Sequence, residues 1–261
     1  MAGKCQWQLC AWNRHLPGNE LPHANILLLG IDGARHGYWV TAASDVDSSS
    51  LVFELTRDLS PLFTRAARNE TLIVIDVPIG ILSGSAAGAG RVCDREARRA
   101  VGPRRQSSVF TPPSRGAFGA ATRVEASERN SNACGLGVGC QPWGILRRIE
   151  AVDAMMSPVL EANVREGHPE VSFALLKGSF LEWSKKSAEG RRERLELLRE
   201  HGSRIDVDAE RLRLGRGNVA GDDIIDAAAM LVTARRIVTG AVTRLGGAIR
   251  DSRGVLMQIW A

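Results

Sequence analysis

Two aspartates follow apolar segments of strand length. Asp32 comes directly after the run 26–31, and Asp76 comes directly after 71–75, a continuous run rich in β-branched residues. A carboxylate beside such a run is costly to bury unless it is paired, hydrogen-bonded or bound to a metal ion. Ligands of open α/β sheets collect at strand ends, so two neighbouring strands would bring both carboxylates together. The alternative is that each carboxylate accepts backbone hydrogen bonds in a turn.

A further set of acids lies in the segment Gly221-Asp222-Asp223-Ile-Ile-Asp226-Ala. In a helix, Asp226 shares a face with Asp222 (i, i+4) and with Asp223 (i, i+3), where like charges repel by about 0.2–0.5 kcal/mol and a cation would reverse that cost. Acids at a helix start also cap free N–H groups. We therefore expect Asp222 or Asp223 to be partly a cap and Asp226 to be the better metal ligand. The alanines that follow would let this helix approach a sheet closely.

Acids from distant parts of a chain suit one chemistry in particular. Magnesium and manganese take hard oxygen ligands, and two such ions held by carboxylates activate water and neutralise the leaving oxygen of a phosphodiester. The five cysteines have neither zinc-ribbon spacing nor an accompanying His pair, so free thiols in a reducing compartment are expected. The residues thus predict a Mg²⁺ or Mn²⁺ site rather than a zinc site.

The elements that must position these acids can be placed from the hydrophobic pattern. Strands are predicted at 26–32, 38–43, 51–55 and 71–76, and a short one around 164–173; the first two form a hairpin. Helices are predicted at 61–69, 91–101, 143–156, 187–201 and 222–238. The fold class is therefore α/β, with a mixed five-stranded sheet flanked by helices, and the order of elements is that of ribonuclease-H-like proteins. We expect a flexible extension over 1–24, one domain over 25–240 and a tail over 241–261.

Composition limits the function classes further. The net charge is +5, and 30 of the 34 basic residues are arginine, whose guanidinium suits phosphate. The excess can equally reflect the codon bias of a GC-rich genome. No apolar run approaches the length that crosses a bilayer, and the N-terminus lacks the apolar core of a secretory signal, so we expect a cytoplasmic protein without membrane contact. Nucleic acid is a permitted partner.

An ordered set of motifs resembles a known family, the one catalogued as domain of unknown function 429, over roughly residues 26–237. The motifs are Gly30-Ile-Asp32-Gly33-Ala34, Ile75-Asp76-Val77-Pro78-Ile79-Gly80, Arg91-Val-Cys-Asp94-Arg-Glu-Ala-Arg98, Ser108-Val-Phe110-Thr-Pro-Pro113, Gln141-Pro-Trp-Gly-Ile145 with Glu150 and Asp153, His168-Pro-Glu170-Val-Ser-Phe173, Ser184-Lys-Lys186 and Asp222-Asp-Ile-Ile-Asp226-Ala227. The family is described as predicted nucleases with a ribonuclease-H fold. The last motif also resembles Holliday-junction resolvases, in which two acids three residues apart bind metal.

The resemblance implies roles for particular residues. It implies a catalytic set of Asp32, Asp76, Glu170 and Asp226, and metal ligands Asp32, Asp76, Asp223 and Asp226. Glu170 is placed at one end of the strand predicted around 164–173, although it can also be a surface residue. A helical and loop insertion at about 83–160, after the fourth strand, would face the substrate and bind it through Arg91, Asp94, Arg98, Arg104, Ser108 and Phe110. The plainer alternative is that Asp94 and Arg98 form an exposed i, i+4 ion pair.

Two other functions remain open at this point. ATP-binding phosphotransferases of the actin and sugar-kinase group share the fold but need Gly-rich phosphate loops with hydroxyl residues, which the segments after Asp32 and Asp76 lack. A non-catalytic domain that binds nucleic acid is the other. The favoured expectation is a Mg²⁺- or Mn²⁺-dependent nuclease.

Overall fold

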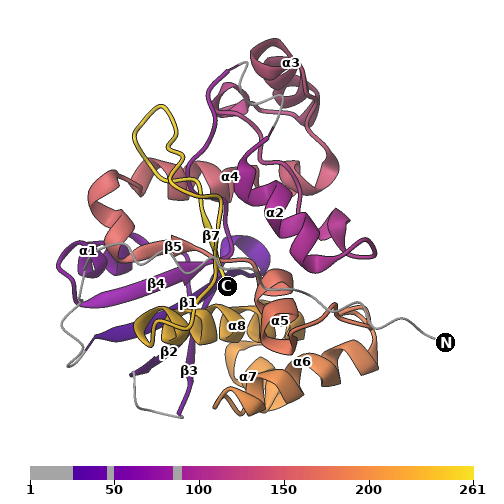
Figure 1. Ribbon diagram of the computed structural model, residues 1–261. Coiled ribbons are helices and arrows are strands. Elements are labelled where there is room, and N and C mark those ends of the chain that lie inside the picture. Colours follow the sequence, from indigo (N-terminus) through magenta and orange to yellow (C-terminus); the bar gives the residue numbers. More distant parts are fainter. Residues whose placement is uncertain (1–25, 46–49, 85–89) are drawn as a thin grey trace.

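The computed structural model describes residues 26–45, 50–84 and 90–261, and a five-stranded sheet forms its centre (Figure 1). Its strands are β1 (Leu27–Gly33), β2 (Trp39–Asp45), β3 (Val52–Thr56), β4 (Thr71–Ile75) and β5 (Val164–Glu166), in the order β3-β2-β1-β4-β5. β2 is antiparallel to β1 and β3, whereas β1, β4 and β5 are parallel. The predicted hairpin and mixed α/β sheet are confirmed. The extension predicted for 1–24 lies outside the described residues.

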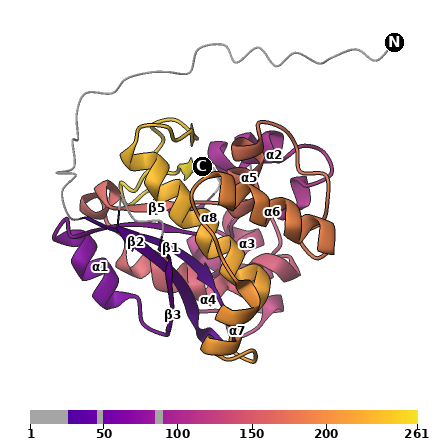
Figure 2. The same cartoon turned by 90° about the horizontal axis from the view of Figure 1, so that it is seen from below.

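Helices cover both faces of the sheet, because alternate side chains of its central strands enter different cores. Leu72 and Val74 of β4 pack with α5 (Pro169–Lys177), α6 (Ala188–Glu200), α7 (Val207–Leu214) and α8 (Gly221–Val238). Ile73 and Ile75 pack with α1 (Ser60–Ala67) and α4 (Cys140–Met155) on the opposite face. Two further helices, α2 (Val92–Val101) and α3 (Arg123–Cys134), precede α4 in the long connection from β4 to β5. Figure 2 shows α8 lying across the sheet.

The packing of α8 on β1 is unusually close. A Cβ atom placed on Gly30 would lie 2.1 Å from the carbonyl oxygen of Ala227 and 2.2 Å from the backbone nitrogen of Leu231. Ala227, Ala228 and Ala229 are fully buried at this contact. The expectation that small residues bring this helix onto the sheet is confirmed, and the contact fixes the height of Asp226 above the strand ends.

The strand predicted around 164–173 is wrong beyond its third residue. β5 ends at Glu166, and α5 begins at Pro169, which occupies the first turn of the helix. Proline is favoured there because its fixed φ suits the helix and its missing N–H has no intrahelical partner. Glu170 therefore lies in the first turn of a helix and not at the end of a strand.

The last residues of the chain are part of the packed structure. β6 (Arg244–Leu245) pairs with β7 (Ile259–Trp260), and Trp260 also bridges to Gly167 just beyond β5. Met257 and Ile259 are buried against Cys93 and Ala97 of α2. The segment thus joins α2 to the edge of the main sheet. None of the helices in the described ranges has the length and apolarity required to cross a membrane.

Candidate active site

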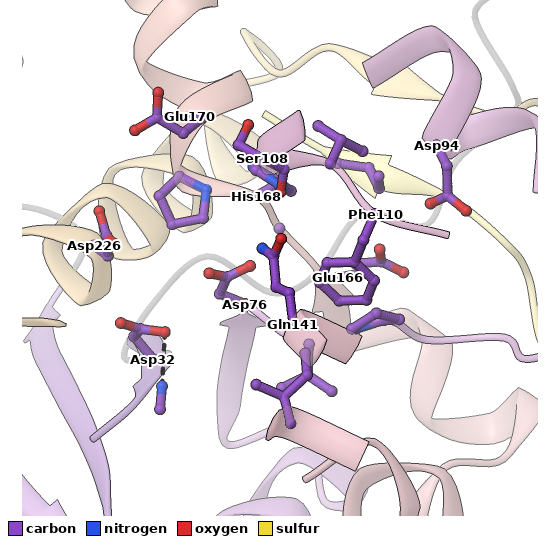
Figure 3. Close-up of a pocket in the computed structure, with 18 of the residues that line it drawn as sticks. Asp32, Asp76, Asp94, Ser108, Phe110, Gln141, Glu166, His168, Glu170 and Asp226 are labelled. Atoms are coloured by element: carbon purple, nitrogen blue, oxygen red, sulfur yellow. Dashed lines mark hydrogen bonds between the residues drawn. The ribbon is translucent and has the colours of Figure 1, made fainter. Parts of the chain in front are cut away.

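A cavity of about 520 Å³ opens beyond the ends of β1, β4 and β5 (Figure 3). Acidic residues, basic residues and a few apolar ones line it together. The acids are Asp32, Asp76, Asp94, Glu166, Glu170 and Asp226; the bases are Arg91, Arg104, Arg105, Arg148, Lys185 and Lys186, with His168; the others include Ser108, Phe110, Gln141 and Ile145. The cavity therefore combines six carboxylates with six arginine and lysine side chains.

The parallel pairing of β1 and β4 brings Asp32 and Asp76 together. Ile31 pairs with Ile75, so the next residue of each strand lies at the same edge, and the Asp76 N–H donates to the Ile31 carbonyl at 2.9 Å. The Asp32 carboxylate accepts the N–H of Gly33 at 2.7 Å. Burial raises the pKa of Asp32 well above its usual range, and repulsion from Asp76 and Asp226 raises it further. Burial also raises the pKa of Asp76.

α8 adds Asp226 to this pair (Figure 3). Asp226 is 2% exposed, and burial raises its pKa to about 6 against the opposing influence of Lys185. Lys185 Nζ donates to Asp226 Oδ2 at 2.7 Å. Burial alone would lower the pKa of Lys185, but Asp226, Asp32 and Asp76 together raise it above its usual range. The ammonium group of Lys185 therefore compensates the charge of three converging carboxylates.

The other two acids of α8 lie outside the cavity lining. Asp223 accepts the Ala220 N–H at 2.8 Å through Oδ2, so the prediction that one of these acids caps the helix is confirmed for Asp223. Asp222 lies 4.0 Å from Lys185. Asp226 is thus the one member of the Asp222/Asp223/Asp226 set that reaches the cavity.

Glu170 reaches the cavity from α5 but is tied to a buried arginine. Arg194 of α6, only 1% exposed, donates to Glu170 Oε1 at 2.6 Å. The second oxygen, Oε2, is buried without a hydrogen-bond partner among the described residues. Nothing in the sequence pattern indicates this pair, because its members are 24 positions apart on different helices.

The carboxylates are of the type that binds divalent cations, but in the described ranges they are not arranged around one point. Asp226 Oδ1 is buried without a hydrogen-bond partner in the described part of the chain, and unpaired carboxylate oxygens are the ligands that magnesium and manganese prefer. No three carboxylate, imidazole or thiol groups of the described ranges surround one point at ligating distance. The Lys185 ammonium group lies against Asp226 instead. The donor set suits a hard divalent cation that displaces this ammonium.

Asp32→Asn is expected to stabilise the cation-free protein at pH 8, by about 1.4 kcal/mol for each unit that separates the folded-state pKa of Asp32 from its unfolded value. The raised pKa means that the folded state holds the Asp32 proton more tightly than the unfolded chain does. Wild-type stability is therefore lost as pH rises from about 4 through the folded-state pKa, and the variant, which carries a neutral amide at this position, escapes that loss.

Urea unfolding in chelator at pH 8 and pH 5 measures this effect. The advantage of Asp32→Asn at pH 8 should shrink at pH 5. A variant that is less stable than wild type at both pH values would show that the Asp32 carboxylate is a stabilising group, contrary to the repulsion described above.

In the wall of the cavity, Arg91, Asp94 and Glu166 form a buried ion cluster. Arg91 donates to Asp94 at 2.6 Å and to both oxygens of Glu166 at 2.7 Å, and to the carbonyl of Ile79 at 2.8 Å. Glu166 also accepts the Ile79 N–H at 2.7 Å, so the cluster fixes the segment that follows Asp76. The guanidinium group of Arg91 has its donors engaged within the protein, and burial raises the pKa of Glu166 to about 7.

The remaining residues expected to face the substrate divide into two groups. Arg104, Ser108 and Phe110 line the cavity. Arg98 does not: it donates to the Val109 carbonyl at 2.8 Å and to Thr111 at 2.7 Å, and so braces the loop that carries them. The alternative of an exposed Asp94–Arg98 pair is wrong, because Asp94 is 1% exposed and pairs with Arg91.

Several cavity residues gave no interpretable signal in the sequence. Arg148 of α4 lies over the Trp39 ring and donates to the Ala34 carbonyl, so its guanidinium group lies beside Gly33 in the cavity lining. Lys185 and Lys186 come from the loop between α5 and α6, within a motif noted only for its resemblance. His168 contacts the Ser108 carbonyl through Nε2 at 3.3 Å, and its Nδ1 has no hydrogen-bond partner among the described residues.

Comparison with known proteins gives one match. The family model described as "Protein of unknown function (DUF429)" matches residues 30–249, which include every acid of the cavity and α8. No curated protein and no solved structure matches the chain.

Proposed function

The chain belongs to the DUF429 family of proteins of unknown function, and we propose that it is a divalent-metal-dependent nuclease that hydrolyses phosphodiester bonds in the cavity described above. The observation that carries the proposal is the convergence of Asp32, Asp76 and Asp226 in a cavity that Arg104, Arg105, Arg148, Lys185 and Lys186 also line. Carboxylates alone would repel a phosphodiester. A cation between them and surrounding basic side chains make the same cavity attractive to one.

The arrangement of the sheet supports a ribonuclease-H-like fold for this nuclease. The strand order is β3-β2-β1-β4-β5, with β2 alone opposite in direction, and α8 crosses the sheet beside β1. The connection between β4 and β5 contains α2, α3 and α4, and we assign the substrate-facing insertion to it. Arg104, Ser108 and Phe110 reach the cavity from this connection.

Each group in the cavity has a role in the proposed reaction. Asp32, Asp76 and Asp226 would hold Mg²⁺ or Mn²⁺, which supplies an activated water and charge neutralisation when bound. Lys185 would exchange its carboxylate partners for a phosphate oxygen. Arg148, held by Trp39 and Ala34, is positioned to pair with a second phosphate oxygen. His168 Nδ1, buried without a hydrogen-bond partner among the described residues, would hydrogen-bond to the substrate.

Calorimetric titration of Mn²⁺ and Mg²⁺ into wild type, Asp76→Asn and Asp226→Asn tests the proposal. We expect saturable binding to wild type that is lost in both variants, together with a fall in hydrolysis of single-stranded and structured oligonucleotides on the order of 100-fold or more, because even changes one shell away from a metal cost 10–100-fold. Asp45→Asn, at an exposed carboxylate at the end of β2, is the matched control and should behave as wild type.

Two outcomes contradict the proposal. Equal heats from wild type, Asp76→Asn and Asp226→Asn would show that the cavity does not hold the cation. Protection of the wild type against thermal unfolding by ATP, with no hydrolysis of any oligonucleotide, would instead support the phosphotransferase alternative.

A further inference from the structure

A second hollow of about 520 Å³ lies along α6, apart from the cavity described above. It is lined by Ala188, Arg191, Arg192, Leu195, Glu196, Arg199, Arg204 and Ile205, and we call it the α6 groove. No residue of this lining is shared with the acidic cavity. The α6 groove is therefore a separate surface feature, and none of its residues takes part in the hydrolysis proposed above.

The described residues that line the α6 groove carry a net positive charge, from four arginines and one glutamate. Arg192, Arg199 and Arg204 are exposed, and none of them has an ion-pair partner in the described ranges of the chain. Arg191 pairs with Asp208 of α7 at 3.1 Å, and Glu196 is the sole acid among the described residues of the lining. The three arginines without such a partner are suited to phosphate, with which guanidinium groups pair bidentately.

The floor of the groove is apolar. Leu195 and Ile205 are partly buried and pack against the core beneath α6. Arg194 points to the opposite side of the helix, where it is buried against Glu170 and Phe173. The arginines of α6 thus form two groups. Arg194 holds the helix to the protein, whereas the arginines of the groove face solvent above an apolar floor that a sugar or base can contact.

The α6 groove directly follows the acidic cavity along the chain. Lys185 and Lys186 line the cavity, and the next element along the chain is α6, whose first residue, Ala188, lines the groove. A helix of 13 residues is roughly 20 Å long. Phosphates of one DNA strand follow each other at about 3.4 Å along a duplex axis and farther apart in an extended strand, so this length spans several of them.

We propose that the α6 groove binds the phosphodiester backbone of a nucleic-acid strand on its way to the acidic cavity. This inference rests on the proposed nuclease function, because it identifies the chemistry of the substrate beyond the scissile bond. The binding is electrostatic and does not depend on base sequence, and a strand of several nucleotides is bound more tightly than a dinucleotide.

Fluorescence anisotropy with labelled 20-nucleotide oligo(dT) and oligo(rU) in chelator measures binding without cleavage. We expect Arg192→Glu/Arg199→Glu to weaken binding at least about tenfold, and to flatten the dependence of log K on log salt by roughly 0.7 for each lost phosphate contact. Glu196→Gln removes the sole acid among the described residues of the lining and is expected to tighten binding about two- to threefold, a gain that misfolding cannot produce.

Arg65→Glu/Arg68→Glu, at the C-terminal end of α1, is the charge-matched control. Both arginines are exposed, and α1 lies on the side of the molecule away from α6 in both views (Figures 1 and 2). We expect this variant to retain wild-type affinity.

Three results would overturn the α6 groove as a strand-binding site: undiminished binding by Arg192→Glu/Arg199→Glu, an equal loss in the α1 variant, or equally tight binding of polyglutamate, which would indicate an acidic protein partner. Hydrolysis is measured separately with Mn²⁺ present. A wild type that binds strands through α6 but cleaves none would refute the nuclease and leave the groove established.

Discussion

Replacing Gly30 with alanine is expected to lower the free energy of unfolding by about 3 kcal/mol or more, at or above the upper end of what overpacking costs. The added Cβ would lie within 2.2 Å of two backbone atoms of α8, and backbone cannot rotate away as a side chain does. The strand cannot retreat either, because Gly30 pairs with Ala42 on one side and Val74 on the other. The helix must move, and Asp226 moves with it.

Urea unfolding of Gly30→Ala and Gly144→Ala measures this contact directly. Gly144 lies inside α4 and an added Cβ meets nothing within 4 Å, so alanine there should stabilise the protein by about 0.5–1 kcal/mol. Mn²⁺ affinity should fall in Gly30→Ala and stay unchanged in Gly144→Ala. Equal stabilities of the two variants would mean that α8 is not held against β1 as described.

The sheet could be predicted from sequence because its signals are local. The run 71–75 is buried on both faces, and its last four positions are all large and apolar, so the pattern is unambiguous. The prediction of a strand around 164–173 was wrong for a local reason too. The apolar residues of α5 follow His168-Pro169, and a short apolar run can form either a strand or a buried helix. Proline in the first turn and Gly178 with φ of +69° at the end were the available helix signals.

The carboxylates of the cavity were predictable and their partners were not. Asp32 and Asp76 follow apolar runs of strand length, and Asp226 directly precedes three alanines in α8, so each one is conspicuous where it occurs. Lys185 and Arg194 lie in polar segments where a basic residue is ordinary. Their importance comes from tertiary contacts with Asp226 and Glu170, which no local pattern encodes.

Glu166 is the clearest residue that sequence reasoning missed. Glu166 is the last residue of β5, much as Asp32 lies next to the last residue of β1 and Asp76 follows β4. The rule that acids collect at strand ends therefore applied to Glu166 equally. The prediction of one strand over 164–173 put the strand end at the wrong residue and directed attention to Glu170. The structure assigns Glu166 a different role from the other acids, since both of its oxygens are engaged by Arg91.

Arg91→Met is expected to destabilise the protein by about 3–5 kcal/mol, the cost of removing one partner from a buried ion pair. Arg91 is 2% exposed and compensates two buried carboxylates, so its loss leaves Asp94 and Glu166 facing each other. The pKa of Glu166, about 7 with Arg91 present, will rise further. A carboxyl group with a raised folded-state pKa lowers the free energy of unfolding of the protein as pH increases. The destabilisation of Arg91→Met relative to wild type should therefore be larger at pH 8 than at pH 5.

Urea unfolding at these two pH values, with Arg99→Met as control, checks the expectation. Arg99 is on the same helix, exposed and without an ion-pair partner in the described chain, so its replacement should change stability by less than about 0.5 kcal/mol. Because Arg91 and Glu166 together hold the backbone of Ile79, Arg91→Met should also weaken Mn²⁺ binding at Asp76. A stable Arg91→Met with lost oligonucleotide binding would assign the guanidinium to substrate, which its engaged donors argue against.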